Sequence, residues 1–307
     1  HERSGAVTTR PDVVARFLDT AVDSTDLLTL VVSTYHSASV VSAALRLADR
    51  CRSLDLIIAD EAHHLAGRTN ARFVPVLRDN EISARSRLFQ TATPVIVGGG
   101  CRVDELSGAS ELARCMDDPQ VFGPVGYTLS VGDAIEAGLL ANYRVVVTTP
   151  RDGADTPEKA ALGALCDVIA RYGVRRILTF HNRVAGARGF AQRITELGSV
   201  AGTEVRGFAI DGSMDADERH RILHELGRTD TDGATVVSSA QCLREGSDVP
   251  AVDAVVFADP RTSQVGISQA IGRALRTHPG KDVGTIVVPL VLDPDADDQE
   301  QLADSAY

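Results

Sequence analysis

The 307-residue sequence has no tryptophan, only 4% aromatic residues, and just two lysines, Lys159 and Lys281. Its other permanent cations are arginines. Their planar guanidinium groups suit bidentate phosphate contacts, although a GC-rich genome encodes the same bias. The formal net charge of -11 argues against a protein that binds nucleic acid through bulk positive charge. A local basic track remains compatible with this composition.

Paired cysteines and long apolar runs are also missing. No apolar stretch approaches the roughly 18 to 20 residues needed to cross a bilayer, and the N-terminus has no basic segment followed by an apolar run. The sequence therefore predicts a soluble, cytoplasmic chain without a membrane partner. Five scattered cysteines form no Cys-x-x-Cys pair, so free thiols are expected in place of a disulfide framework or a zinc ribbon; they are Cys51, Cys101, Cys115, Cys166 and Cys242.

The length and the order of apolar segments predict two α/β domains. At about 150 residues per domain, 307 residues correspond to two, and 44% hydrophobic content is enough for two cores. Strand-like apolar runs alternate with amphipathic helical stretches, the pattern of a parallel sheet covered on both faces. We expect a first domain over residues 1–142, a second over 143–292, and an acidic tail or linker over 293–307.

Periodicity and turn residues give an expected series of elements. In the first half these are helices Val13–Thr20, Ala38–Arg50 and Gly132–Ala137, strands Leu27–Ser33, Leu54–Ala59, Arg87–Thr91 and Arg144–Thr148, and a loop that extends to about Pro124. In the second half they are helices Pro157–Tyr172, Arg183–Leu197, Ala216–Leu226 and Val265–Leu275, with strands Arg175–Phe180, Glu204–Ile210, Ala234–Ser238, Ala254–Ala258 and Gly284–Pro289.

Two adjacent carboxylates give the strongest local signal. The apolar run Leu54–Ala59 predicts a buried parallel strand, and Asp60 and Glu61 follow at its C-terminal end, where open α/β sheets bind ligands. Because two acids are costly there without a cation, we interpret Asp60 as a Mg²⁺ ligand and Glu61 as the base for a water that attacks phosphorus. Capping of the next helix is the alternative role for both acids. His63 and His64 do not form the His-Glu-x-x-His zinc arrangement.

A second cluster lies in the segment Gln269 to Arg276. On a helix, Arg273 and Arg276 would share one face, with Gln269 one turn earlier. Guanidinium groups aligned in this way fit the oxygens of a transferring phosphoryl group. An exposed basic helix face is the alternative.

These segments together resemble the superfamily 2 helicases and translocases of the DEAD/DEAH-box type. In family order, Asp60 to His63 resembles motif II, Thr91 to Thr93 motif III, Arg244 to Pro250 motif V, and Gln269 to Arg276 motif VI. Weaker matches are Ser33 to Ser37, Thr179 to Asn182, and Asp211 to Ser213. The segment Phe122 to Leu140 is similar to restriction-enzyme-like helicase subunits and to bacterial helicases with a helicase-associated domain.

The resemblance implies two RecA-like domains that bind ATP and Mg²⁺ in the cleft between them. It implies catalytic roles for Glu61, Arg273 and Arg276, and a Mg²⁺ ligand in Asp60. Roles in ATP binding and coupling fall on Asp60, His63, Thr91, Thr93, Gly246, Asp248 and Gln269. Roles in binding the nucleic-acid backbone fall on Thr34, His181, Asn182, Asp211, Gly212 and Arg244.

One family feature is missing, since no Gly-x-x-x-x-Gly-Lys-Ser/Thr phosphate loop occurs. Gly280-Lys281 is followed by Asp282 and comes after the other motifs. The chain also begins at His1. We therefore expect a fragment of a longer ATPase that binds ATP poorly by itself.

The main hypothesis is an ATP-driven DNA helicase or translocase, with nuclease or other restriction or repair subunits as possible partners. DNA is favoured over RNA. Three alternatives stay open: an RNA-dependent ATPase, a catalytically silent nucleic-acid-binding module, and a metal-dependent hydrolase built on Asp60, Glu61, His63 and His64.

Overall fold

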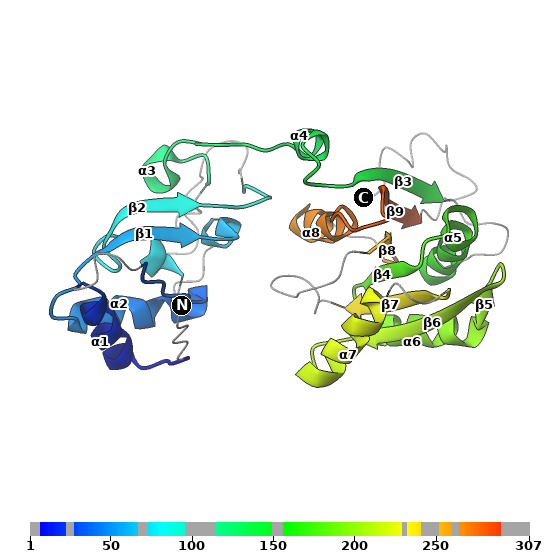
Figure 1. The fold of residues 1–307 in the computed structure, drawn as a ribbon, viewed down its shortest axis with the longest axis horizontal. Coiled ribbons are helices and arrows are strands. Elements are labelled where there is room, and N and C mark those ends of the chain that lie inside the picture. Colours follow the sequence, from blue (N-terminus) through cyan, green and yellow to red (C-terminus); the bar gives the residue numbers. More distant parts are fainter. Residues whose placement is uncertain are drawn as a thin grey trace, which may run out of the picture. The chain divides into compact units, whose positions relative to one another are not determined.

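A computed structural model divides the chain into two compact units, residues 1–127 and 128–307 (Figure 1). It describes residues 7–22, 28–66, 73–95, 115–148, 156–228, 232–240, 252–259 and 264–289. The division lies before the expected boundary at 142. The chain just ahead of that point is tied to the second unit, because the Ala141 amide donates to the Leu275 carbonyl at 2.8 Å.

The first unit packs two helices against a small parallel sheet. Its elements are α1 (Pro11–Ala21), η1 (Tyr35–Ser37), α2 (Ala38–Leu47), β1 (Leu54–Ala59), η2 (Ala62–Leu65), η3 (Val74–Leu77), β2 (Ala84–Phe89) and α3 (Pro119–Phe122). Among the described residues of this unit, β1 and β2 alone form a sheet, with Leu54 opposite Ala84. Leu54, at the start of β1, and Ile57 pack against a core that includes Leu18 and Leu45.

Three expectations for the first unit need correction. The predicted strand Leu27–Ser33 does not form over residues 28–33, which pair with neither β1 nor β2; Leu27 lies outside the described residues. A strand is stable only with a hydrogen-bonded neighbour, which an apolar run cannot supply by itself. β2 begins at Ala84 and ends at Phe89, earlier than the predicted 87–91. In the expected loop, the Asp118 side chain accepts the Gln120 amide and so starts α3.

The burial of β1 also differs from the expectation. The strand has the predicted bounds, but Leu56 and Ile58 are 50% and 57% exposed. In a strand, alternate side chains point to opposite faces, so one face of β1 is in the core while the other is open to solvent. The apolar run therefore predicted the position of the strand correctly, but the prediction that the strand is buried was wrong.

The second unit is built around a seven-stranded sheet in the order β3-β9-β8-β4-β7-β6-β5. Every described pairing is parallel except the antiparallel pair β5–β6. Its elements are α4 (Val131–Glu136), β3 (Asn142–Thr148), α5 (Pro157–Tyr172), β4 (Arg176–His181), α6 (Val184–Leu197), β5 (Ser199–Val200), β6 (Thr203–Ile210), α7 (Ala216–Gly227), β7 (Ala234–Ala240), β8 (Ala254–Phe257), α8 (Gln264–Ala274) and β9 (Val283–Pro289). The predicted α/β class is confirmed.

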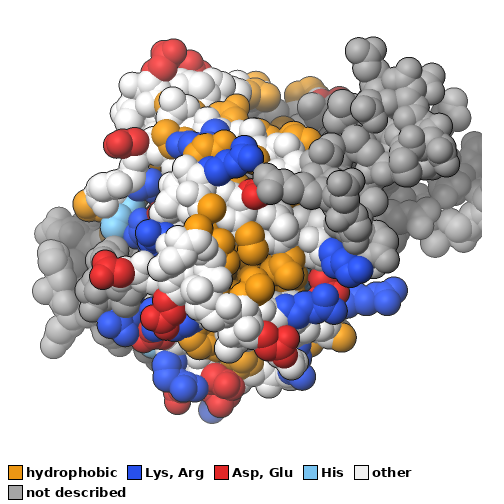
Figure 2. Space-filling view, turned by 90° about the vertical axis from the view of Figure 1, so that its right-hand side faces the viewer, with side chains coloured by type: hydrophobic (Ala, Val, Ile, Leu, Met, Phe, Trp, Pro, Cys, Tyr) orange, Lys and Arg blue, Asp and Glu red, His pale blue; other side chains and the backbone are white. Residues whose placement is uncertain are grey.

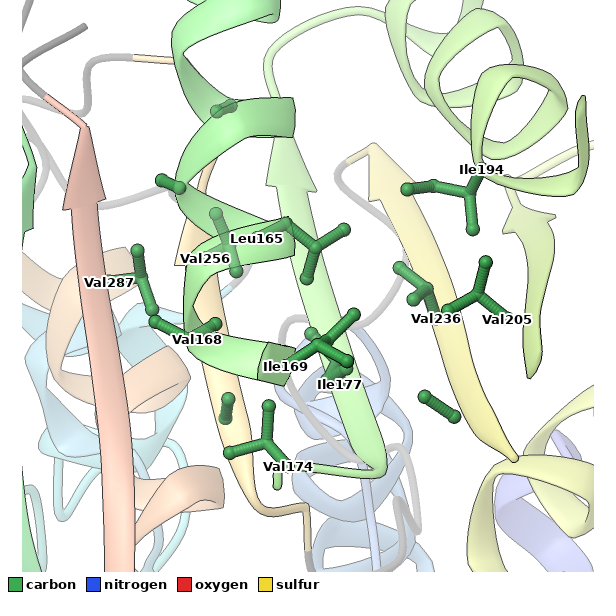
Figure 3. Packing of buried hydrophobic residues seen from close by; sticks show 14 of the residues in the cluster. Leu165, Val168, Ile169, Val174, Ile177, Ile194, Val205, Val236, Val256 and Val287 are labelled. Atoms are coloured by element: carbon green, nitrogen blue, oxygen red, sulfur yellow. The ribbon is translucent and has the colours of Figure 1, made fainter. Parts of the chain in front are cut away.

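Helices cover both faces of this sheet, and alternate strand residues supply the two cores. Ile177, Val236, Val256 and Val287 pack with residues of α5 and α6, as Figure 3 shows. Their immediate neighbours Leu178, Val237, Val255 and Ile286 point to the other face and pack with residues of α7 and α8. Complete burial of one such side chain stabilises the fold by about 1.5 to 3 kcal/mol. The strand register is therefore strongly specified.

Two glycines let helices approach the sheet closely. A Cβ on Gly207 in β6 would lie 2.1 Å from the Ala191 carbonyl oxygen of α6. A Cβ on Gly284 in β9 would lie 2.2 Å from the Ala274 carbonyl oxygen, at the end of α8. Since real Cβ atoms are not found at such distances, glycine at these two positions sets the depth of both helices.

One residue, Asp253, connects three strands at their N-terminal ends through its carboxylate and its backbone. The Asp253 side chain accepts the amides of Arg175 and Arg176 at 3.0 and 2.9 Å, and pairs with the Arg176 guanidinium at 2.7 Å. The Asp253 carbonyl accepts the Thr285 amide at 2.8 Å. Asp253 therefore connects the starts of β4, β8 and β9. Burial by itself raises the pKa of its carboxyl group, but the hydrogen bonds from Arg176 and Arg175 together outweigh it and lower the pKa.

No helix of the described residues is long and apolar enough to span a membrane.

Candidate functional site

The two acids lie where the first unit leaves β1. The exposed Asp60 accepts the Glu61 amide through Oδ1 at 3.0 Å, and its carbonyl accepts the Tyr35 hydroxyl at 2.5 Å. Glu61 has φ 49° and ψ 46°, in the left-handed region that non-glycine residues rarely adopt. Such a conformation costs on the order of 1 kcal/mol and is often found at functional sites. It starts the turn Ala62–Leu65 immediately after the strand.

A polar network joins Glu61 to the segment after β2. The buried His63 has Nδ1 3.3 Å from Glu61 Oε2 and 3.0 Å from Thr91 Oγ1. Thr91 Oγ1 in turn accepts the Thr93 amide at 3.1 Å. The Ala62 amide donates to the Gln90 carbonyl at 2.8 Å and holds the two segments together. The structure thus places the predicted residues Glu61, His63, Thr91 and Thr93 in one network.

The donor set at Asp60 fits a Mg²⁺ ion that is bound mainly by phosphate oxygens and water. Such an ion keeps several waters and takes one or two protein carboxylates, in addition to phosphate oxygens. Asp60 is exposed and uses one carboxylate oxygen for the Glu61 amide, which leaves further acceptor capacity. Among the described residues, no three His, Cys, Asp or Glu side chains are grouped as a complete protein-only metal site.

The two predicted arginines lie at the end of α8, but not both on the helix. Arg273 is in its last turn and is 6% exposed, whereas α8 ends at Ala274 and the exposed Arg276 forms an antiparallel bridge with Leu140. The expectation of one shared helix face was therefore wrong. Just past the helix, the Leu275 carbonyl accepts the Ala141 amide. The Gln269 backbone lies in α8, and its side chain is outside the described set.

Arg273 is an electrostatically costly cation. Burial lowers the pKa of its guanidinium, and the positive charge of Arg276 lowers it further. The charged form of Arg273 is therefore destabilised, and an anion brought to this end of α8 would offset that cost. The two positive charges therefore repel each other, and different backbone elements hold the two arginines.

The expected nucleic-acid residues divide into exposed and buried groups. Thr34 is exposed before η1, and its hydroxyl donates to Ser37 Oγ at 3.3 Å. Asn182 and Gly212 are exposed at strand-to-helix turns, and the Asn182 amide donates to Asp259 at 2.7 Å. The His181 ring is only 3% exposed, with Nε2 2.9 Å from Thr179 Oγ1.

Asp211 is a buried structural acid. Arg188 donates to its Oδ2 at 2.8 and 2.5 Å, and the amide and hydroxyl of Ser213 donate to Oδ1 at 2.9 and 2.5 Å. These bonds, those of Ser213 first, lower the pKa of Asp211 to about 2. The side chain therefore fixes the turn that presents Gly212 and has little surface of its own for a ligand.

Comparisons with known proteins bear on the fold and the family of the chain. Residues 160–278 match the family model of the helicase conserved C-terminal domain. The structure of the ATP-dependent Type ISP restriction-modification enzyme LlaBIII bound to DNA superposes with a TM-score of 0.69 and 27% identity, over 86% of this chain and 20% of that one. A nuclease-deletion mutant of the Type ISP enzyme LlaGI, in complex with a DNA substrate mimic, gives 0.64 and 26%, over 93% of this chain and 19% of that one.

Residues 160–278 thus form a helicase conserved C-terminal domain, and the chain as a whole is similar to superfamily 2 helicase cores.

Curated relatives extend this likeness of the helicase core. A probable helicase, A859L, of African swine fever virus (isolate Pig/Kenya/KEN-50/1950) is 25% identical over 92% of this chain and 30% of its own length. UvrABC system protein B of Thermotoga neapolitana is 31% identical over 37% of this chain and 16% of its own length. The helicase core thus spans about 30% of the viral relative. The seven-stranded unit is the RecA-like domain that the sequence predicted.

Several predicted features of the helicase core lie outside the described residues. They are Arg244, Gly246 and Asp248 of the motif V resemblance and the tail 293–307.

Several contacts join residues that are far apart in the sequence, and local patterns did not predict them. Tyr35 reaches Asp60 from 25 positions away, and Arg188 reaches Asp211 from 23. Ser238 of β7 accepts the Thr179 hydroxyl at 2.9 Å. Tyr35 falls inside the weak match Ser33 to Ser37, which was the one available signal; Arg188 and Ser238 belong to no motif.

Charge on the helicase core is mixed, without one dominant sign, on the face drawn in Figure 2. Lys and Arg side chains there lie among Asp and Glu side chains across the described surface. Any attachment to an anionic polymer at this face would depend on particular groups more than on a broad positive field.

Proposed function

We propose that this helicase core hydrolyses ATP to move on DNA. The observation that carries the proposal is the network from Glu61 through His63 to Thr91, at the C-terminal edge of a parallel strand. There a carboxylate can take a proton, and its position is coupled to the segment after β2.

Asp60 and Glu61 divide the chemistry at this edge. Asp60 would hold Mg²⁺, which supplies charge neutralisation for the phosphates when it is bound. Glu61 accepts a proton from the attacking water, and its left-handed backbone conformation places it at the turn that follows the strand. His63 orients Glu61 and transmits its position to Thr91 and Thr93.

The second unit contributes positive charge to the same reaction. Arg273 and Arg276 neutralise charge on the transferring phosphoryl group, which is the role of arginine fingers. The lowered pKa of Arg273 supports this proposal, since an anion would stabilise its charged form.

Nucleic-acid contacts come from turn amides and small hydroxyl groups. Thr34, Asn182 and Gly212 are exposed at turns and can contact phosphates without reading base sequence. His181 and Asp211 shape these turns from beneath. The DNA-bound states of the LlaBIII and LlaGI structures favour DNA over RNA. They also suggest a restriction or repair setting, with nuclease or other subunits as partners.

The decisive experiment is Glu61→Gln in the full-length protein. Full-length protein is used because the 307 residues contain no phosphate loop, so we expect the isolated chain to hydrolyse ATP poorly. The amide keeps the shape of the side chain but cannot accept the proton. We expect ATP binding to persist and turnover to fall by about 10²-fold or more.

Glu81→Gln is the matched control. Glu81 lies in the same unit and accepts bonds from Ser42 and Arg46, so the same chemical change there should leave turnover within about twofold. Near-parental turnover in Glu61→Gln would remove Glu61 as the base.

Thr34→Asp tests the nucleic-acid track. A carboxylate placed against a phosphate should weaken binding to every DNA sequence alike, with a shallow salt dependence of only a few released counterions. Titrations of labelled DNA and RNA oligonucleotides at several salt concentrations measure both effects. Unchanged DNA affinity in Thr34→Asp would mean that Thr34 does not contact the nucleic acid. Tighter binding of RNA than of DNA would reverse the substrate assignment.

A further inference from the structure

Lys281 makes an unusual set of bonds at the end of α8. Its Nζ donates to the carbonyl oxygens of Val252 at 2.6 Å, Ala274 at 2.5 Å and Arg276 at 3.0 Å. An ammonium group has three N–H donors, and here each meets a backbone acceptor. Two of these acceptors belong to the exit of α8, and the third precedes β8.

Two of the three carbonyls belong to residues at or next to the two arginines. Ala274 follows Arg273 directly, and another acceptor is the carbonyl of Arg276 itself. A cation near a helix C-terminus also interacts favourably with the unpaired carbonyls of its last turn. Lys281 therefore fixes the backbone at both positions from which the guanidinium groups extend.

Two further contacts hold the same few residues. The Ala141 amide donates to the Leu275 carbonyl at 2.8 Å, between the two carbonyls that Lys281 binds. Gly284 leaves the space that the Ala274 carbonyl occupies. The end of α8 is thus held by contacts from two separate segments, residue 141 and residues 281–284, and among these described contacts the side chain is that of Lys281.

We propose that Lys281 is a positioning residue for the arginine pair, and that it sets the backbone from which Arg273 and Arg276 reach the phosphoryl group. This role rests on the proposed function of those arginines. Other side chains cannot replace the ammonium, because a methionine has no donor and a guanidinium presents its donors in a planar fork, not toward three converging acceptors.

The protonation state of Lys281 gives the role a distinct signature. Burial lowers the pKa of Lys281 to about 8, with the Arg176 charge acting in the same direction and the Asp253 carboxylate opposing it. Further charged or titratable groups near it are Arg276, whose carbonyl it binds, His278, which forms a β-bridge with it, and the adjacent Asp282. A neutral amine has only two N–H donors and must release one carbonyl.

The test is Lys281→Met in the full-length protein, with Lys159→Met as the matched control. Lys159 is the chain's other lysine and is exposed in the first turn of α5. We expect Lys281→Met to lower kcat for ATP hydrolysis about 10- to 100-fold with KM changed less than about threefold, since displacement of a catalytic group by about 1 Å can cost 10²-fold. The kcat of Lys159→Met should stay within about twofold of the parent.

The pH profile is a second readout. In the parent, kcat should fall as the pH rises through about 8, and Lys281→Met should lose that alkaline decline.

Chemical rescue keeps the test valid if Lys281→Met folds poorly. Lys281→Ala should recover kcat when propylammonium is added, because this ion replaces the missing side-chain atoms and restores three N–H donors. Tetramethylammonium carries the same charge without a donor and should not rescue. Recovery with both ions, or with neither, would overturn the role.

Arg273→Ala separates failure of this inference from failure of the proposed function. If Arg273→Ala loses turnover while Lys281→Met keeps it within twofold of the parent, Lys281 has no positioning role and the proposed function stands. If Arg273→Ala retains parental turnover, the arginine assignment fails, and the role of Lys281 fails with it. Amide exchange at Ala141, expected to accelerate in Lys281→Met, reports directly on the backbone it holds.

Discussion

Strands β1 and β4 each have six residues and are parallel to their neighbours, yet they are buried to very different extents. By composition β1, with one charged residue, should be the more deeply buried, because β4 contains Arg176, Thr179 and His181. The structure shows the reverse: β4 is buried along its whole length, and β1 at one position only. β4 lies between β7 and β8 with helices on both faces, whereas β1 pairs with β2 alone among the described strands. Burial therefore depends on a strand's neighbours more than on its own residues.

Replacement of matched leucines should break this comparison most strongly. Leu178 in β4 is fully buried, and Leu56 in β1 is half-exposed. We expect Leu178→Ala to lower the free energy of unfolding by about 2 to 5 kcal/mol and Leu56→Ala by less than about 1 kcal/mol. Urea unfolding of both variants of this chain measures the difference. Equal costs would show that the open face of β1 is covered in solution.

Matched glycines sharpen the comparison within the well-packed unit. Gly207→Ala and Gly284→Ala each force a methyl group against a helix carbonyl, and each should cost about 1 to 3 kcal/mol of stability. The end of α8 carries Arg273, whereas α6 carries no residue with a proposed role in hydrolysis. We therefore expect Gly284→Ala alone to lower kcat at temperatures where both variants are folded. A similar loss of kcat in Gly207→Ala would attribute the effect to general loosening of the unit.

Acid sensitivity should show the smallest effect. The pKa of Asp211 is lowered to about 2, so its charge stabilises the fold above the ordinary value near 4, and this stabilisation is lost as the pH falls toward about 2. Asp211→Asn should therefore be less stable than the parent at pH 7, and the gap should close between pH 4 and pH 2. Denaturation series at these pH values measure the gap. A gap that stays constant with pH would show that the charge of Asp211 does not contribute.

The elements that the sequence predicted best carry their own start and stop signals. Helix α5 has the predicted bounds because Thr156 accepts the Lys159 amide at its start and Gly173 takes a left-handed conformation at its end. Both signals lie within a few residues of the helix. The acid cluster was predicted for the same reason, since Asp60 and Glu61 directly follow their strand.

Features set by distant partners escaped prediction. Residues 28–33 have the composition of a strand, but pairing decides whether one forms. The end of α8 is set by Ala141 and Lys281, which stand outside the motif, so the periodicity of Gln269 to Arg276 placed Arg276 on the helix. Arg188 had no local signal that connected it to Asp211. In each case the missing information was a tertiary contact.

Because of Asp253, the N-terminal and C-terminal ends of the strands in the seven-stranded sheet have different roles. By joining the starts of β4, β8 and β9, this residue fixes their alignment at the edge remote from His181 and Asn182. A slip of one residue would turn every side chain to the opposite face, and such a slip is opposed at the Asp253 edge. The turns at the C-terminal ends of the strands can therefore be redesigned without loss of strand alignment, for instance to change which nucleic acid the protein binds. Asp253 fixes the alignment of the strands, and the turns that follow their C-terminal ends can change in sequence.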